Sequence, residues 1–244
     1  MEELKLKGIV LKSVDLKDSD KLITIFSLEK GIVRAKARGV KKNKAKLSFA
    51  TQPFAFIEFV LAEKSGYYTV TNATSIDQFF DLTADFDNFV FMMSCMEICE
   101  KCVADGDSCP QLFLLLLNSF KLVCYEGVSS SNILLKFIIE SMRILGYNFE
   151  IQKCSCCGKQ LNNSNEFSFD TNGFLCDGCL TKNDHVELKE TLYNILRKID
   201  DSTLENLKNL KFLSREDVLM AIRLLCRDFK IVTGEEISTI KQFL

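Results

Sequence analysis

The chain has 244 residues, of which 47% are hydrophobic, and a formal net charge of −2. This length is enough for two modest domains or one large domain. It contains no run of eighteen apolar residues, which excludes a membrane-spanning helix. The first residues, Met1-Glu2-Glu3, have no signal-peptide pattern, and eleven cysteines without such a signal indicate a reducing compartment. The sequence therefore predicts a cytoplasmic protein without membrane contact.

Charge is divided unevenly along the chain. Residues 1–80 carry fourteen Lys/Arg and nine Asp/Glu, a net charge of +5. Residues 81–244 carry seventeen Lys/Arg and twenty-four Asp/Glu, a net charge of −7. This division indicates that the first part meets a polyanion, whereas the second meets proteins or solvent.

The first third of the chain shows strand patterns. Short apolar-rich runs lie between turn residues and predict strands over 4–14 (interrupted at Gly8), 21–26, 32–38, 54–61 and 67–74. Five short strands at this spacing predict a small barrel such as an OB-fold, with an open five-stranded sheet as the competing architecture.

The hydrophobic period changes to that of helices after residue 81. Helices are predicted over 86–99, 111–125, 132–145, 187–199, 204–210 and 214–232. The helix over 111–125 is apolar nearly all round, so we expect it at the centre of a helical core. Ser214 is the expected cap of the last helix, with Asp217 at its third position and Gly234 at its end. The fold class is α+β: a five-stranded barrel over 1–80 and an α-helical domain over 81–244.

The third predicted strand and the loop after it are strongly basic. Small apolar residues (Val33, Ala35 and Ala37) alternate with cations, and a period of two places the cations on one face. Seven cations lie in thirteen residues without an acid, and such an edge can track a phosphate backbone. A solvated, charged edge strand that prevents aggregation is the alternative. The seven candidate residues are Arg34, Lys36, Arg38, Lys41, Lys42, Lys44 and Lys46.

Four aromatic residues of the same region are candidates for base stacking. Phe54, Phe56, Tyr67 and Tyr68 each carry a flat face that a base can cover. Aromatic residues at such positions more often fill a barrel core.

Two C-x2-C pairs, Cys154/Cys157 and Cys176/Cys179, stand eighteen residues apart. This spacing is typical of a four-cysteine Zn²⁺ site, which is closed and therefore structural. We expect Gly158 and Gly178 to permit the tight knuckles, and Cys156 could compete with Cys157 as a ligand. The zinc-binding insertion covers about residues 150–182 of the helical domain. Its linking segment is polar except for a few apolar residues, so the metal must supply much of its folding energy.

The sequence gives no argument for catalysis. His185 is the only histidine, which excludes a triad and a multi-histidine metal site. His185-Val186-Glu187 matches the H-x-E of zinc deaminases, but it follows the cysteines instead of preceding them. No Gly-rich phosphate loop occurs. A metalloenzyme would need a coordination position open to water, which four thiolates do not leave.

These features together resemble the RecO family of bacterial recombination mediators over essentially the whole length. The most specific marks are the helix Phe137–Gly146 and the double cysteine knuckle with Phe167 and Gly173 between its halves. The weaker N-terminal marks are Gly8-Ile9-Val10-Leu11, Asp20, Leu22-Ile23-Thr24-Ile25-Phe26, Gly31 and Arg38-Gly39-Val40-Lys41-Lys42.

The resemblance implies an N-terminal OB-fold, a helical C-terminal domain and a bound zinc held by Cys154, Cys157, Cys176 and Cys179. It implies binding of single- and double-stranded DNA by the basic strand and loop, annealing of complementary strands, and no bond-breaking chemistry. The implied partners are single-strand DNA-binding protein, RecR and, indirectly, RecA, at the nucleoid. The alternative is an OB-fold RNA-binding or protein-scaffold module with a structural zinc.

Overall fold

The chain forms two compact units. The computed structural model describes residues 2–164, 166–182, 184–212 and 214–243. The barrel unit comprises Met1–Phe89 and Cys99–Lys121, and the helical unit comprises Val90–Ile98 and Leu122–Leu244. The helices α1 (Phe86–Cys102) and α2 (Pro110–Glu126) each contribute residues to both units. A domain division at residue 80 stays a prediction.

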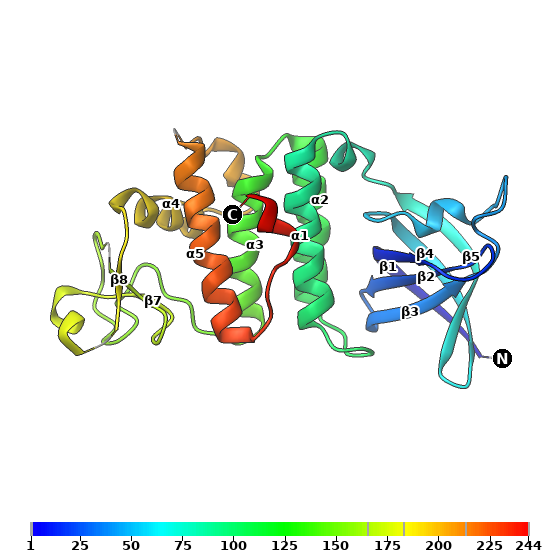
Figure 1. Ribbon diagram of the computed structural model, residues 1–244, viewed down its shortest axis with the longest axis horizontal. Helices are drawn as coiled ribbons and strands as arrows, with labels where there is room; N and C mark the ends of the chain where they lie inside the picture. Colours follow the sequence, from blue (N-terminus) through cyan, green and yellow to red (C-terminus); the bar gives the residue numbers. More distant parts are fainter. Residues whose placement is uncertain (1, 165, 183, 213, 244) are drawn as a thin grey trace. The chain divides into compact units, whose positions relative to one another are not determined.

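Five strands form a closed barrel in the order β1-β2-β3-β5-β4, drawn in blue and cyan in Figure 1. Parallel pairing of β3 with β5 and antiparallel pairing of β1 with β4 complete the closure. Closure excludes the open sheet and confirms the predicted five-stranded barrel. The strands are β1 (Glu2–Asp15), β2 (Lys21–Ser27), β3 (Gly31–Ala37), β4 (Phe56–Lys64) and β5 (Tyr67–Asp77).

Alternation along the strands builds the barrel core. In β3 the small residues Val33, Ala35 and Ala37 are buried, as predicted, and the side chains between them face outward. The expected interruption of β1 at Gly8 is wrong, because β1 is continuous there. Gly8 is instead a close-packing position, where a Cβ would overlap the Ile25 side chain. The register of β1 against β2 shifts between Val10 and Lys12, and such an irregularity bends a strand that two neighbours share.

The helix α2 packs against barrel residues. The rings of Phe26 and Phe113, and those of Phe54 and Phe120, meet edge-on with 5.5 Å between centroids. Such aromatic pairs stabilise a core beyond their buried area. The first part of α2 therefore belongs to a core shared with the barrel, and not to the centre of a purely helical one as its sequence predicted.

In the helical unit, α3 (Ser130–Ile144), α4 (Glu190–Asp201) and α5 (Arg215–Thr233) pack on one another (Figure 1). The cap of α5 is as predicted: Ser214 Oγ accepts a hydrogen bond from the Asp217 N–H at 3.1 Å, and Gly234 ends the helix with φ of 77°. None of the described helices is long and apolar enough to cross a membrane.

The segment over 204–210 is a 3-10 turn and not an α-helix. This turn, η4, covers Glu205–Asn209 and has no side-chain cap at its start. Five residues without a cap do not offset the cost of nucleating an α-helix, so the tighter i→i+3 pattern is formed.

Three short strands complete the helical unit. They are β6 (Glu166–Ser168), β7 (Gly173–Phe174) and β8 (Val186–Glu187), with β6 in the middle. A 3-10 turn, η3 (Asp177–Lys182), follows β7, and a last one, η5 (Thr239–Phe243), closes the chain.

Gly31 is a position where the fold of the barrel unit requires glycine. Its φ is +57°, and a Cβ there would overlap the Asp107 carbonyl oxygen of the loop that follows α1. We expect Gly31→Ala to lower the free energy of unfolding by about 2–5 kcal/mol, since left-handed strain adds to the clash. Gly66→Ala is the matched control, because Gly66 has φ of +80° with nothing within 4 Å. Urea unfolding measures both, and equal losses for the two variants would contradict the role of the close contact.

Candidate metal centre and nucleic-acid interface

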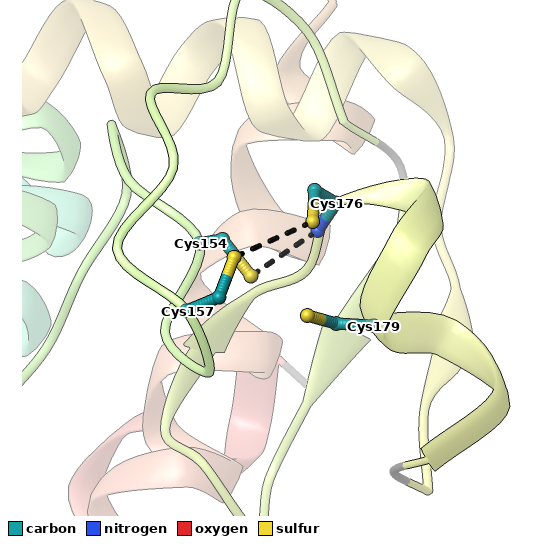
Figure 2. A group of neighbouring side chains, drawn as sticks. All are labelled: Cys154, Cys157, Cys176 and Cys179. Atoms are coloured by element: carbon teal, nitrogen blue, oxygen red, sulfur yellow. Dashed lines mark hydrogen bonds between the residues drawn. The ribbon is translucent and has the colours of Figure 1, made fainter.

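Two backbone knuckles bring four cysteines to one point. The first knuckle closes with a hydrogen bond from the Gly158 N–H to the Cys154 carbonyl at 2.8 Å, and the second with one from the Cys179 N–H to the Cys176 carbonyl at 2.8 Å. Gly158 has φ of +74°, which favours glycine. The same expectation for Gly178 is wrong, since its φ is not positive. Figure 2 shows Cys154 and Cys157 on a loop, facing Cys176 and Cys179, of which Cys179 lies on the 3-10 turn η3.

The sulfur positions fit a tetrahedral metal ion. All four Sγ atoms lie within 4.8 Å of one another, and Cys157 Sγ is 3.7 Å from Cys176 Sγ. Zinc–sulfur bonds of about 2.3 Å in a tetrahedron place sulfurs about 3.8 Å apart. The Cys176 N–H also points at Cys154 Sγ from 3.4 Å, a contact typical of a thiolate. These four cysteines could therefore hold a metal ion.

The pKa shifts of the cysteines also favour a bound metal ion. Burial raises the pKa of Cys154, but backbone N–H groups of Cys176, Cys157 and Cys156 more than offset this and lower it to about 6. Hydrogen bonding with Cys157 raises the pKa of Cys179 far above its ordinary value, and burial adds to this. Backbone N–H groups thus favour the thiolate of Cys154, while hydrogen bonding and burial oppose ionisation of Cys179. A central cation would favour the thiolate form of both.

Cys156 lies outside the group of four sulfurs, although its side chain hydrogen-bonds to Cys179. Cys156 and Cys157 are both exposed, so their membership of the four-sulfur group distinguishes them and their burial does not. The geometry therefore favours Cys157 over Cys156 as the partner of Cys154, which agrees with the order of ligands expected from the sequence.

An aromatic cluster lies behind the cysteines. Phe167 and Phe174 are fully buried, and their ring centroids are 5.2 Å apart. Phe174 also meets Tyr193 of α4 at 4.9 Å, and Phe149 meets Phe167 at 6.2 Å. The sequence predicts that the metal supplies much of the folding energy of this segment, and these rings add a small core beside it. Apolar residues spaced across three elements left no periodic signal that could reveal it.

The basic segment divides into paired and unpaired cations. Arg34 forms an ion pair with Asp105, Lys36 Nζ lies 2.8 Å from Asp20, and Lys41 Nζ lies 2.6 Å from Asp15. Within the part of the chain that the structure describes, the other four cations have no ion-pair partner. These four exposed residues, the free basic set, are Arg38, Lys42, Lys44 and Lys46.

Asp20 fixes the loop that carries the free basic set. Its Oδ1 accepts the Gly39 N–H at 2.8 Å while its Oδ2 holds Lys36, and the hydrogen bond from Lys36 lowers the pKa of Asp20. The Lys41 N–H donates to the Ser19 carbonyl at 3.0 Å. The turn between β1 and β2 therefore holds the basic loop in place.

These acidic partners were missed from the sequence. A signal existed, because β2 and β3 form an antiparallel pair in which Lys21 faces Ala37. A hairpin of this kind brings residue 20 beside residue 38. Asp15 and Asp20 stand on either side of the turn between β1 and β2.

The stacking candidates are sorted by burial. Phe54 is fully buried against Phe89 and Phe120 and has no face for a base. Tyr67 is 79% exposed. Tyr68 is half-buried under Lys30, whose Nζ lies 5.8 Å from the ring centroid. Phe56 is half-buried, with its ring centroid 6.0 Å from that of Phe113. Tyr67 is therefore the most exposed of the four candidates.

His185 has an ordinary structural partner. Its Nε2 lies 3.7 Å from Glu166 Oε2, and it is absent from the metal-binding group found among the described residues. It is an exposed residue immediately before β8.

The chain thus joins a closed five-stranded barrel with a basic loop to a helical unit with a four-cysteine site. Residues 1–79 match the family model for the N-terminal part of recombination protein O, and residues 83–226 match the model for its C-terminal part. The chain belongs to the RecO family of DNA repair proteins.

Curated relatives agree with this assignment. The DNA repair protein RecO of Acetivibrio thermocellus is 34% identical over 209 residues, which cover 85% of this chain and 83% of that one. The RecO protein of Clostridium novyi is 30% identical over 202 residues, covering 83% and 78%. The RecO protein of Bacillus pumilus is 29% identical over 179 residues, which cover 73% of this chain and 69% of that one.

Proposed function

We propose that this protein is a recombination mediator that binds single- and double-stranded DNA through its basic loop and anneals complementary strands. The observation that carries the proposal is the free basic set, four exposed cations on a loop that Asp20 holds in place. Lysine and arginine neutralise phosphates without reading sequence, so binding is expected on any strand. Neutralising two strands at once lowers their repulsion, which favours annealing.

The proposed role is one of binding, without bond-breaking chemistry. We propose that all seven basic residues lie along the DNA path, with the three ion-paired cations exchanging their acids for phosphates. Family membership supports the proposed partners, which are single-strand DNA-binding protein, RecR and, through loading onto coated DNA, RecA. The acidic stretch 81–244, with a net charge of −7, fits protein partners better than a long DNA path. The place of action is the nucleoid in the cytoplasm.

The metal in this proposal is Zn²⁺ with a structural role. Cys154, Cys157, Cys176 and Cys179 would hold it, and they leave no position open to water. Bound there, zinc supplies a cross-link between the two knuckles and no reactive group.

The test replaces Arg38, Lys42, Lys44 and Lys46 together by glutamine. Removing four phosphate contacts lowers the affinity for a single-stranded oligonucleotide by about 10²–10³-fold near 0.1 M salt. Fluorescence anisotropy measures the affinity, and the rate of annealing of two complementary oligonucleotides is expected to fall with it.

The matched control removes the same charge elsewhere in the barrel unit. Lys5, Lys7, Lys12 and Lys64 lie on β1 and β4, outside the basic loop. Their glutamine variant is expected to keep most of the affinity. Equal losses of affinity for the two variants would mean that the loop contributes only to the general positive charge of the barrel unit. A preference for structured RNA over both DNA forms would favour the RNA-binding alternative.

A further inference from the structure

The helical unit contains a second basic site that the proposed function does not use. A pocket of about 270 Å³ lies between α5 and the segment that follows it. Four of its seven lining residues are cationic and one is acidic, a local charge of +3 in a stretch whose net charge is −7. The lining residues are Arg223, Cys226, Arg227, Lys230, Glu236, Ile237 and Lys241.

Three of these cations form a row on one face of α5. Arg223, Arg227 and Lys230 are spaced i, i+4 and i+7, and all three are exposed. At about 1.5 Å per residue the row extends about 10 Å along the helix axis. One strand of a duplex places a phosphate about every 3.4 Å along its axis, so the row spans about three phosphates.

Neighbouring groups hold the cations in place. Arg223 donates to the Phe243 carbonyl at 3.3 Å, and the Arg227 guanidinium lies 4.2 Å over the Phe169 ring. Lys230 and Lys241 lie 3.1 and 2.7 Å from the two carboxylate oxygens of Glu236. Ordered cations lose little conformational freedom when an anion binds, which favours affinity.

The segment opposite α5 is fixed as well. Both carboxylate oxygens of Glu97 accept backbone N–H groups, from Ser238 at 2.9 Å and from Thr239 at 2.8 Å. Ile237 and Ile240 are buried. Lys241 therefore stands at a defined place beside the α5 row.

We propose that this pocket binds the phosphates of a nucleic-acid strand, as a second site separate from the basic loop of the barrel. The proposal rests on the proposed function, since it takes DNA as the ligand. The row favours a polyanion with evenly spaced charges over a peptide with a single terminal carboxylate. Two phosphate-binding sites on one chain can hold two strands, which is what annealing requires.

The test changes the pocket without touching the barrel. Replacing Arg223 and Lys230 together by glutamine leaves the Arg227–Phe169 contact intact. We expect the slope of log K against log salt for a single-stranded oligonucleotide to become shallower by about 1.4, and the affinity near 0.1 M salt to fall about 25-fold. Glu236→Gln removes the one acid among the described residues that line the pocket and is expected to strengthen binding.

The matched control is the pair Lys189→Gln and Lys208→Gln, two exposed lysines of the helical unit outside the pocket, each with one acidic partner. This pair is expected to change the slope little. Melting temperatures close to that of the unmodified chain establish that each variant is folded.

The outcomes separate this inference from the proposed function. An unchanged slope in the Arg223/Lys230 variant, with strong DNA binding that depends on the barrel loop, overturns the second site alone. A flat salt response of the unmodified chain overturns both. If a fluorescent acidic peptide loses binding in the Arg223/Lys230 variant while DNA does not, the pocket is a peptide site and the inference is wrong.

Discussion

We expect Cys176→Ser to release the proposed metal and to unfold the segment between the knuckles, while the barrel unit is expected to keep its DNA binding. A four-cysteine site contributes on the order of 10–16 kcal/mol at neutral pH, and one lost thiolate opens it to water. Phe167 and Phe174 belong to β6 and β7 within this segment, so we expect their packing against Phe149 and Tyr193 to loosen when the metal is lost. The measurement combines zinc content with thermal unfolding followed by near-ultraviolet circular dichroism.

The control for this variant is Cys156→Ser, because Cys156 lies outside the four-sulfur group. Cys156→Ser is expected to keep one zinc per chain and the melting temperature. A Cys176→Ser chain that retains both its zinc and its melting temperature would contradict the ligand set. Loss of zinc in Cys156→Ser alone would assign the ligand role to Cys156.

The second large effect concerns Asp228, a carboxyl group buried in α5. The residue is 0% exposed, and neither carboxylate oxygen has a hydrogen-bond partner among the described residues. Burial raises the pKa of Asp228 to about 7. Because the folded state holds this proton more tightly than the unfolded state, stability is highest below the unfolded pKa near 3.8 and falls as the pH rises toward 7.

Asp228→Asn removes this dependence, since asparagine imitates the protonated carboxyl group. A raised pKa of about three units corresponds to about 4 kcal/mol. The variant is therefore expected to be more stable than the unmodified chain by about 4 kcal/mol at pH 8, and by little at pH 4. Urea unfolding of both chains at pH 4, 5, 6, 7 and 8 gives the difference between their free energies of unfolding. The contributions of the other titrating groups are the same in both chains and cancel in this difference.

Glu216→Gln is the control on the same helix, because Glu216 is exposed. It is expected to follow the unmodified chain at each pH. If Asp228→Asn does so too, the buried carboxyl group has a partner that neutralises its cost, and this account of α5 is wrong.

Local patterns predicted much of the fold. Alternation in β3, the Ser214 cap and Gly234 of α5, and the two C-x2-C pairs each depend on residues a few positions apart. Strand number and spacing predicted a small barrel but left an open sheet as the alternative, and the structure confirms the barrel.

Features that depend on distant residues were not predicted. The pairing of Arg34 with Asp105 joins positions 71 apart in the sequence, and Tyr193 meets Phe174 across two elements. The shared core of α2 and the barrel arises in the same way, because Phe113 and Phe120 resemble any apolar helix residues until a partner is known. Helical spacing from Leu224 and Leu225 places Asp228 on the buried face of α5, but nothing local indicates that its carboxylate finds no hydrogen-bond partner among the described residues.

The most direct test of the central claim, that the basic loop binds DNA phosphates, is a salt series. Fluorescence anisotropy of a labelled single-stranded oligonucleotide gives log K against log salt for the unmodified chain and for the variant without the free basic set. We predict slopes that differ by about 3, since each single-strand phosphate contact contributes about 0.7. Parallel lines with the same slope would contradict the claim and leave the loop as a solvated edge of the barrel.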